Sequence, residues 1–233
     1  MKMQCDAYYG GDGMSTKYHI DAGKFDLKKF RISLENRVLI PSRMILKEDI
    51  RVRFQILETE GLYNLEDLMA ALKNKNKIVN FSEKTGLPVG YLTILKREAG
   101  SFFPNPIQLS KFFGIDSRVI EKLESQGIKN SKQLFDQTIT KEKMQKVVSD
   151  AGLSEPELSP IIGLCDLSRL YGVGPVFAGI LYGIGVVSVQ NFVSHSAAEI
   201  VTIYEEVEQK RADFAEKDIQ FALEVAQDLD LWA

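Results

Sequence analysis

Two internal similarities at fixed spacing restrict the architecture of this chain more than its composition does. The stretch "LETEGLYN" from Leu57 aligns with "LESQGIKN" from Leu123 at an offset of 66 residues. A second offset of 58 residues aligns "LSKFFGIDSRVIEKLESQGI" from Leu109 with "LSRLYGVGPVFAGILYGIGV" from Leu167. Similarity of this kind indicates one supersecondary unit used several times. The sequence therefore predicts three related units over roughly residues 46 to 209.

Each unit has the pattern of short helices. In the second unit, Asp116 and Asn130 are typical N-cap residues, and Thr140 opens a further helix. Gly127 and Gly152 are typical of the left-handed residue that ends a helix. Alternating strand-like runs are nearly absent, and only "KYHID" from Lys17 has the pattern of a short strand. The predicted fold class is all-α.

The last part of the chain predicts two closing helices. From Ser196 to Trp232 the sequence contains neither glycine nor proline. Apolar residues recur there with helical spacing, first at Ile200, Ile203, Tyr204 and Val207, and then at Ile219, Leu223, Ala226 and Leu229.

Charge is unevenly distributed along the chain. The 233 residues carry 29 basic and 32 acidic side chains, for a net charge of -3. Residues 1–60 and 61–150 are net positive, by 2 and 4 charges, whereas residues 151–233 carry 4 basic and 13 acidic groups. Any contact with nucleic acid must therefore be local, because the whole protein is not an electropositive surface.

Cysteine and histidine are too scarce for several kinds of site. Cys5 and Cys165 cannot form a disulfide framework or a cysteine-based metal cluster, and His19 and His195 are too few for a histidine-rich site. We therefore expect no metal and no cofactor. Residues 1–14 lack the apolar core of an export signal and are expected to form a mobile tail, so a cytoplasmic location is expected.

Five glycines and a proline occur between Leu170 and Gly185. A phosphate-binding nucleotide loop is disfavoured, because Ile180 and Leu181 follow Gly179 where lysine and serine or threonine are needed. A membrane helix is also considered, since no charged residue occurs from Leu170 to Ala198. Internal glycines and a proline interrupt that run, which disfavours a span, and no membrane contact is expected.

A hairpin between two helices accounts for more of this stretch. Gly172 ends a first helix, Val173 turns inward, and Gly174 supplies an unusual backbone conformation and close approach. Pro175 suits the first position of the second helix, because its missing N–H has no helical partner there. Free N–H groups around Gly174, Val176 and Phe177 would then favour an anionic oxygen.

The stretch "LSRLYGVGPVFAGIL" resembles the helix-hairpin-helix motif. The glycine-hydrophobic-glycine turn of that motif commonly contacts the DNA backbone without reading bases. More broadly, "LIPSR" at Leu39, the "GLYN" and "GIKN" units and the "ADF" and "ALEVAQDLD" ending resemble a bacterial family of unknown function built of degenerate hairpins. This resemblance extends over roughly residues 15 to 233 and implies tandem helix-hairpin-helix repeats followed by closing helices.

The resemblance and the repeats together predict a domain organisation. A mobile tail covers residues 1–14 and an N-terminal segment residues 15–45. The first helix-hairpin-helix unit covers 46–111, the second 112–169, and the third, with the closing helices, 170–233.

The candidate nucleic-acid-binding residues fall into two groups. One is the turn, with Gly172, Val173, Gly174 and Val176, which either holds a phosphate or forms a compact corner between helices. The other comprises lysines related by the 66-residue offset, which either line up a basic edge or simply solvate helix ends: Lys75, Lys77, Lys141 and Lys143. At the second hairpin, the Asp116 carboxylate occupies the place where a phosphate would bind. Asp116 is expected to act as a helix cap.

Two functions remain open from the sequence. The first is non-catalytic, sequence-independent binding to the backbone of duplex or structured nucleic acid, with an affinity that falls steeply with salt. The alternative is a protein-protein interaction scaffold that uses the uncharged surface between Val176 and Val193 or the acidic closing helices. No recognisable motif places a histidine near a nucleophile, so catalysis is not expected.

Overall fold

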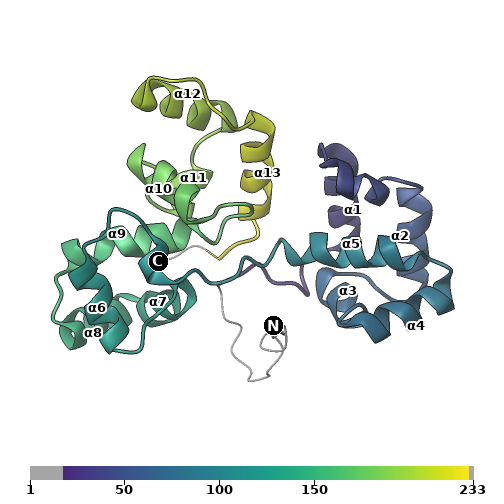
Figure 1. Ribbon diagram of the computed structural model, residues 1–233, viewed down its shortest axis with the longest axis horizontal. Helices are drawn as coiled ribbons and strands as arrows, with labels where there is room; N and C mark the ends of the chain where they lie inside the picture. Colours follow the sequence, from purple (N-terminus) through teal and green to yellow (C-terminus); the bar gives the residue numbers. More distant parts are fainter. Residues whose placement is uncertain (1–17, 231–233) are drawn as a thin grey trace.

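The computed structural model describes residues 18–230, and this part of the chain is helical (Figure 1). Within it, extended backbone pairs only in two isolated bridges, between Asp26 and Asn64 and between Gln108 and Asn130. The all-α prediction is therefore confirmed. The expected strand is wrong over its described part, because Tyr18 to Asp21 form a turn and irregular backbone. The expected tail, residues 1–14, lies outside the described residues.

The helices are short and follow one another closely along the chain. Their bounds are α1 Leu27–Asn36, η1 Pro41–Leu46, α2 Ile50–Thr59, α3 Leu65–Ala71, α4 Lys75–Thr85, α5 Val89–Gly100, η2 Leu109–Lys111, α6 Ser117–Ser125, α7 Ser131–Thr138, α8 Lys141–Ala151, α9 Glu155–Leu167, α10 Pro175–Gly183, α11 Val189–Val193, α12 Ala197–Glu208 and α13 Glu216–Ala226.

The helices gather into two lobes (Figure 1). Helices α1 to α5 form the N-terminal lobe, in which α1 packs on α2 and α5 packs on α3, α4 and η1. Helices α6 to α13 form the C-terminal lobe, in which α9 packs on α7 and α10, and α13 on α11 and α12. Residues 103–108 link the lobes, and His19 contacts this linker by a 2.8 Å hydrogen bond between its Nε2 and the Pro104 carbonyl oxygen.

The backbone turns recur in the order that the sequence offsets predict. The residues with positive φ in the described chain form three sets, and the members of each set have the same place relative to their helices. One set precedes α2, α6 and α10, the next follows the same helices, and the last ends α4, α8 and α12. The sets are Asp49, Gly114 and Gly172; Gly61, Gly127 and Gly185; and Gly86, Gly152 and Gln209.

Side-chain caps recur as well. The side chains of Asn64, Asn130 and Ser188 each accept a hydrogen bond from the N–H three residues later, at the starts of α3, α7 and α11. Asn74, Thr140 and Ser196 do the same for α4, α8 and α12. Because such caps satisfy N–H groups that the helix itself leaves free, the polar residues between apolar runs specify where each helix begins. The predicted starts at Asn130 and Thr140 are confirmed.

In the C-terminal lobe, a buried carboxylate replaces a backbone carbonyl as the acceptor at the start of one helix. The first N–H of α3 donates to the Phe25 carbonyl, and that of α7 to the Ile107 carbonyl. In α11 the equivalent N–H, that of Val189, donates instead to Asp166 Oδ2 at 2.7 Å. Burial raises the pKa of Asp166, against the opposing effects of the nearby Arg169 guanidinium and this hydrogen bond.

Arg169 is itself almost fully buried and makes several contacts at once. Its Nε donates to the Tyr18 carbonyl at 3.0 Å and its Nη2 to the Asp230 carbonyl at 2.6 Å. Its Nη1 donates to Asp166 Oδ1, and its guanidinium lies 4.4 Å from the centre of the Phe135 ring. Both ends of the described chain are therefore fixed to one side chain.

Tyr18 makes the stability of this region sensitive to alkaline pH. Burial raises the pKa of its phenol from 10.0 to about 12, and its hydroxyl lies 2.6 Å from Ser131 Oγ. The unfolded phenol ionises near pH 10, so the stability from neutral Tyr18 is present below that pH and lost as pH rises through about 12. We expect Tyr18→Phe to lower stability at neutral pH but to flatten the alkaline decline. Urea unfolding at about pH 9 and about pH 11 measures both effects.

The uncharged run from Leu170 to Ala198 folds as α10, α11 and the start of α12, separated by turns. Side chains on one face of these helices are buried, including Ala178, Leu181 and Phe192, while Val176 and Val187 are exposed. No helix between residues 18 and 230 has both the length and the apolar character needed to cross a membrane. The two closing helices are confirmed as α12 and α13, although Val207, expected on the apolar face of α12, is exposed.

Candidate nucleic-acid interface

The turn at Gly172 joins the end of α9 to α10. Leu167 and Leu170 are fully buried and anchor the turn, and Val173 points inward, as predicted. Gly172 has φ of +76°, a conformation that residues with a side chain adopt only at a cost, and a Cβ there would contact nothing within 4 Å. The backbone conformation alone therefore favours glycine at position 172, although Asp49 has positive φ before α2.

Gly174 plays a different part from the one expected. Its φ of -90° and ψ of -178° are extended backbone that any residue adopts, so the predicted unusual conformation is wrong for this glycine. Gly174 is the N-cap of α10, and having no side chain it supplies no cap. Pro175 occupies the first helical position, as predicted.

The start of α10 therefore keeps backbone donors free. Pro175 has no N–H, and within residues 18–230 the N–H groups of Gly174, Val176 and Phe177 form no backbone or side-chain hydrogen bond. Unsatisfied N–H groups and the helix dipole together make such an end positive. The Val176 side chain is 60% exposed, so this end of the helix is open to solvent.

The equivalent ends of α6 and α2 are less suited to an anion. Asp116 is the N-cap of α6 and accepts a 2.9 Å hydrogen bond from the Arg118 N–H, which confirms the predicted cap. Glu48 and Asp49 precede α2, and both are exposed. Carboxylates at these two starts would repel a phosphate, so α10 is the most suitable of the three.

The four predicted lysines lie in two separate places. Lys75 and Lys77 begin α4, whereas Lys141 and Lys143 begin α8, and all four are exposed. Figure 1 shows α4 and α8 at opposite ends of the molecule, in different lobes. The four lysines therefore do not form one basic edge, which was one of the two interpretations of their spacing, although each pair remains a local positive site.

Within each pair, the two lysines differ in their contacts. Lys77 Nζ donates to the Ala70 carbonyl at 3.0 Å, and Lys143 Nζ donates to the Asp136 carbonyl at 2.9 Å. These equivalent bonds satisfy carbonyl groups at the ends of α3 and α7, so Lys77 and Lys143 have a structural role. The side chains of Lys75 and Lys141 make no hydrogen bond or ion pair with the described residues.

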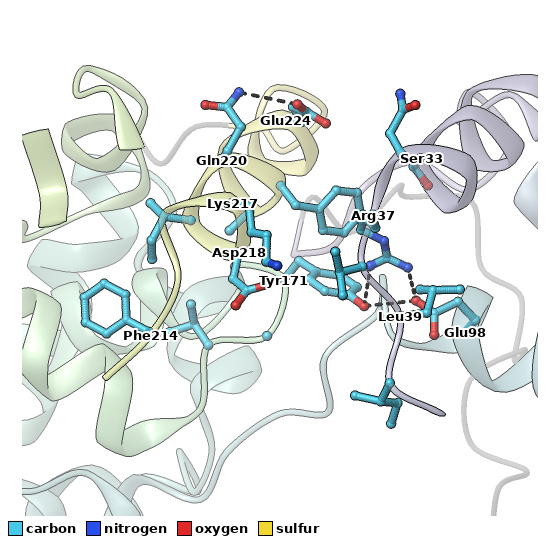
Figure 2. Close-up of a pocket in the computed structure, with 18 of the residues that line it drawn as sticks. Ser33, Arg37, Leu39, Glu98, Tyr171, Phe214, Lys217, Asp218, Gln220 and Glu224 are labelled. Atoms are coloured by element: carbon cyan, nitrogen blue, oxygen red, sulfur yellow. Dashed lines mark hydrogen bonds and ion pairs between the residues drawn. The ribbon is translucent and has the colours of Figure 1, made fainter. Parts of the chain in front are cut away.

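A cleft of about 590 Å³ lies between the lobes beside the turn (Figure 2). Gly172 and Val173 form part of its wall, together with the segment after α1 and the first half of α13. Figure 2 shows Phe214 at one side of the cleft and Arg37 and Glu98 at the other, with Tyr171 between them. The predicted turn residues thus border both solvent and the cleft.

The polar group at the Glu98 side of the cleft was not predicted from the sequence. Glu98 is fully buried on α5 and forms ion pairs with Arg37 and Arg43. Arg37 Nη1 donates to the Tyr171 hydroxyl at 2.8 Å, and that hydroxyl donates to Glu98 at 3.1 Å. The Arg37 guanidinium also stacks 4.0 Å from the centre of the Phe221 ring. The available signal was a carboxylate on the buried stripe of α5, three residues after Leu95.

No metal centre is evident in this part of the molecule. Across residues 18–230, the structure brings together no group of three or more histidine, cysteine, aspartate or glutamate side chains that could hold a metal ion. Cys165 is fully buried and unpaired, and burial raises the pKa of its thiol. Cys5 lies outside the described residues.

Comparison with known protein families gives a match over part of the chain. Residues 114–222 match a domain family of unknown function, DUF4332. This stretch begins at the left-handed glycine before α6 and ends within α13, so it corresponds to the C-terminal lobe and includes the Gly172 turn. No curated protein and no solved structure matches the chain.

Proposed function

We propose that this chain is a non-catalytic protein of tandem helix-hairpin-helix units that binds the backbone of nucleic acid without reading sequence. The open start of α10 carries the proposal, because Gly174, Val176 and Phe177 offer free N–H groups at a positive, exposed helix end. The recurrence of left-handed residues and caps in three sets of helices supports the repeat part of the proposal. Lys75 and Lys141 add local positive charge at other sites.

Val176→Glu tests this contact without threatening the fold. A carboxylate in the first turn of a helix is favourable by about 0.3–1 kcal/mol, so α10 should remain intact. The same carboxylate repels a phosphate, and we expect the affinity for a labelled oligonucleotide at low salt to fall about tenfold or more. Fluorescence anisotropy measures the affinity, and thermal unfolding checks the fold.

Val52→Glu is the matched control. Val52 is 59% exposed and lies in the first turn of α2, the equivalent helix of the first set, where Glu48 and Asp49 already disfavour a phosphate. The control should leave the affinity unchanged. Equal losses in both variants would mean that net charge, rather than the α10 turn, governs binding.

The lysine contribution is best tested at Lys75 and Lys141, because Lys77 and Lys143 also hold carbonyl groups. If Lys75 contacts a phosphate, Lys75→Glu should reduce the slope of log affinity against log salt concentration by about one unit. The wild-type protein should itself show a steep salt dependence. Absence of binding by the wild-type protein at low salt would refute the proposal.

A protein-protein scaffold remains the second candidate because the segment between α1 and η1 exposes apolar side chains. Val38 and Ile40 are exposed there, and Met44 is exposed in η1. Such neighbouring apolar groups favour a protein partner. A pull-down from lysate with and without nuclease separates the candidates, since a protein partner bound directly would survive nuclease treatment.

A further inference from the structure

The Gly172 turn and the cleft between the lobes are parts of one continuous surface. Gly172, Val173 and Phe177 line the cleft, and the free N–H groups of α10 begin at Gly174. A phosphate at the start of α10 would therefore lie at the edge of the cleft. The neighbouring base of the same nucleotide strand is the group best placed to enter it.

The charges in the cleft favour an uncharged occupant. Its basic residues are Arg37, Arg43 and Lys217, and its acidic residues are Glu98, Asp218 and Glu224, so the formal charges cancel. Glu98 is also fully engaged by the two arginines. A second phosphate would gain little electrostatic attraction in a cleft with no net charge, whereas a neutral group with polar edges could bind there.

The lining of the cleft suits a flat aromatic group. Phe177 and Phe214 are both partly exposed in the cleft, and their rings meet edge to face at 5.0 Å between centroids. Lys217 and Asp218 on α13 supply a donor and an acceptor between the two sides, as Figure 2 shows. The volume of about 590 Å³ falls within the usual size of ligand pockets, roughly 300–1,000 Å³. Stacking on aromatic side chains is a general means of holding unpaired bases.

We propose that the cleft receives an unpaired base, so that the nucleic acid bound by this protein is single-stranded at the contact. The inference rests on the proposed function, since it assigns the phosphate of that nucleotide to the α10 turn. It differs from backbone binding alone, because a base held in a duplex cannot reach the cleft. Single strands are therefore preferred over blunt duplexes.

The test compares binding of a labelled thymidine oligonucleotide with binding of a blunt duplex of the same length at low salt. We expect the single strand to bind about tenfold more tightly or better. Phe177→Leu keeps an apolar side chain at this position but removes the aromatic face. It should weaken binding of the single strand about fivefold to a hundredfold while leaving duplex binding and the unfolding temperature nearly unchanged.

Two further variants serve as controls. Phe177→Tyr restores the aromatic face and should retain the preference for single strands. Phe113→Ala removes an exposed aromatic ring outside the cleft and should also retain it. Equal binding of single strand and duplex, or a Phe177→Leu variant that keeps the preference, would overturn the cleft assignment but leave backbone binding standing. Absence of binding to either nucleic acid would remove both proposals.

Discussion

Arg169→Ala is expected to destabilise the protein by about 3–5 kcal/mol, the usual effect of removing one partner from a buried ion pair. The substitution leaves the Asp166 carboxylate buried without its cation, although the carboxylate still accepts the Val189 N–H. It also removes the donors to the Tyr18 and Asp230 carbonyls. Urea unfolding followed by circular dichroism measures the change, as a lower transition midpoint.

A double-mutant cycle separates the ion pair from the loss of packing. Asp166→Ala and Arg169→Ala are measured singly and together. Because either single change leaves one charge uncompensated, we expect the double variant to be less destabilised than the sum of the two. Additive effects would show that Arg169 acts mainly through Phe135 and the two carbonyls, and a loss below about 1 kcal/mol would contradict the role given to the ion pair.

Glu98→Ala is expected to have an effect of similar size, about 3–5 kcal/mol. The change removes the only carboxylate that pairs with Arg37 and Arg43 among the described residues. The two side chains are 14% and 29% exposed, so water replaces little of the lost interaction. Because Tyr171 also loses its acceptor, contacts across the lobes should weaken, and urea unfolding should show the loss.

Glu35→Ala provides a matched control for this prediction. Glu35 also pairs with two arginines, Arg31 at 2.7 Å and Arg51 at 3.1 Å, but the Glu35 side chain is 22% and Arg51 83% exposed, whereas Glu98 is 0% exposed. Surface ion pairs contribute about 1 kcal/mol or less, so this variant should unfold at nearly the wild-type urea concentration. Similar losses at Glu35 and Glu98 would mean that burial does not set the strength of the Glu98 group.

Local signals in the sequence predicted much of the helix pattern. Asn130, Thr140 and Gly152 define helix ends through bonds within a few residues, and the structure has each end where it was predicted. The offsets of 66 and 58 residues likewise align helices that share turns and caps. Such features depend on neighbouring backbone, so a single sequence contains the needed information.

Contacts between distant residues were not predicted. The Glu98 group draws on Arg37, Arg43 and Tyr171, and the Arg169 group joins Tyr18 to Asp230. Gly163 is a further example, because a Cβ there would lie 2.6 Å from the Val187 carbonyl oxygen. Apart from the place of Glu98 on the buried stripe of α5, nothing within a few residues of these positions distinguishes them from ordinary surface charges or helix glycines.

In the candidate site too, local features were predicted from the sequence, whereas the relation between distant segments was not. The sequence placed Val173 inward and Pro175 at the start of a helix, which the structure confirms. It assigned the unusual backbone conformation to Gly174, whereas the structure has the positive φ at Gly172. The lysines do not share one edge, because the two segments related by the 66-residue offset lie in different lobes.

The attachment of Tyr18 and Asp230 to Arg169 has a mechanical consequence. The chain enters and leaves the described fold at neighbouring points, so tension applied between the flanking segments would act first on one guanidinium and its two carbonyl bonds. Most helices, including the whole N-terminal lobe, lie outside that short load path. Pulling on the chain ends would therefore break the hydrogen bonds from Arg169 to Tyr18 and Asp230 before it strained the Gly172 turn.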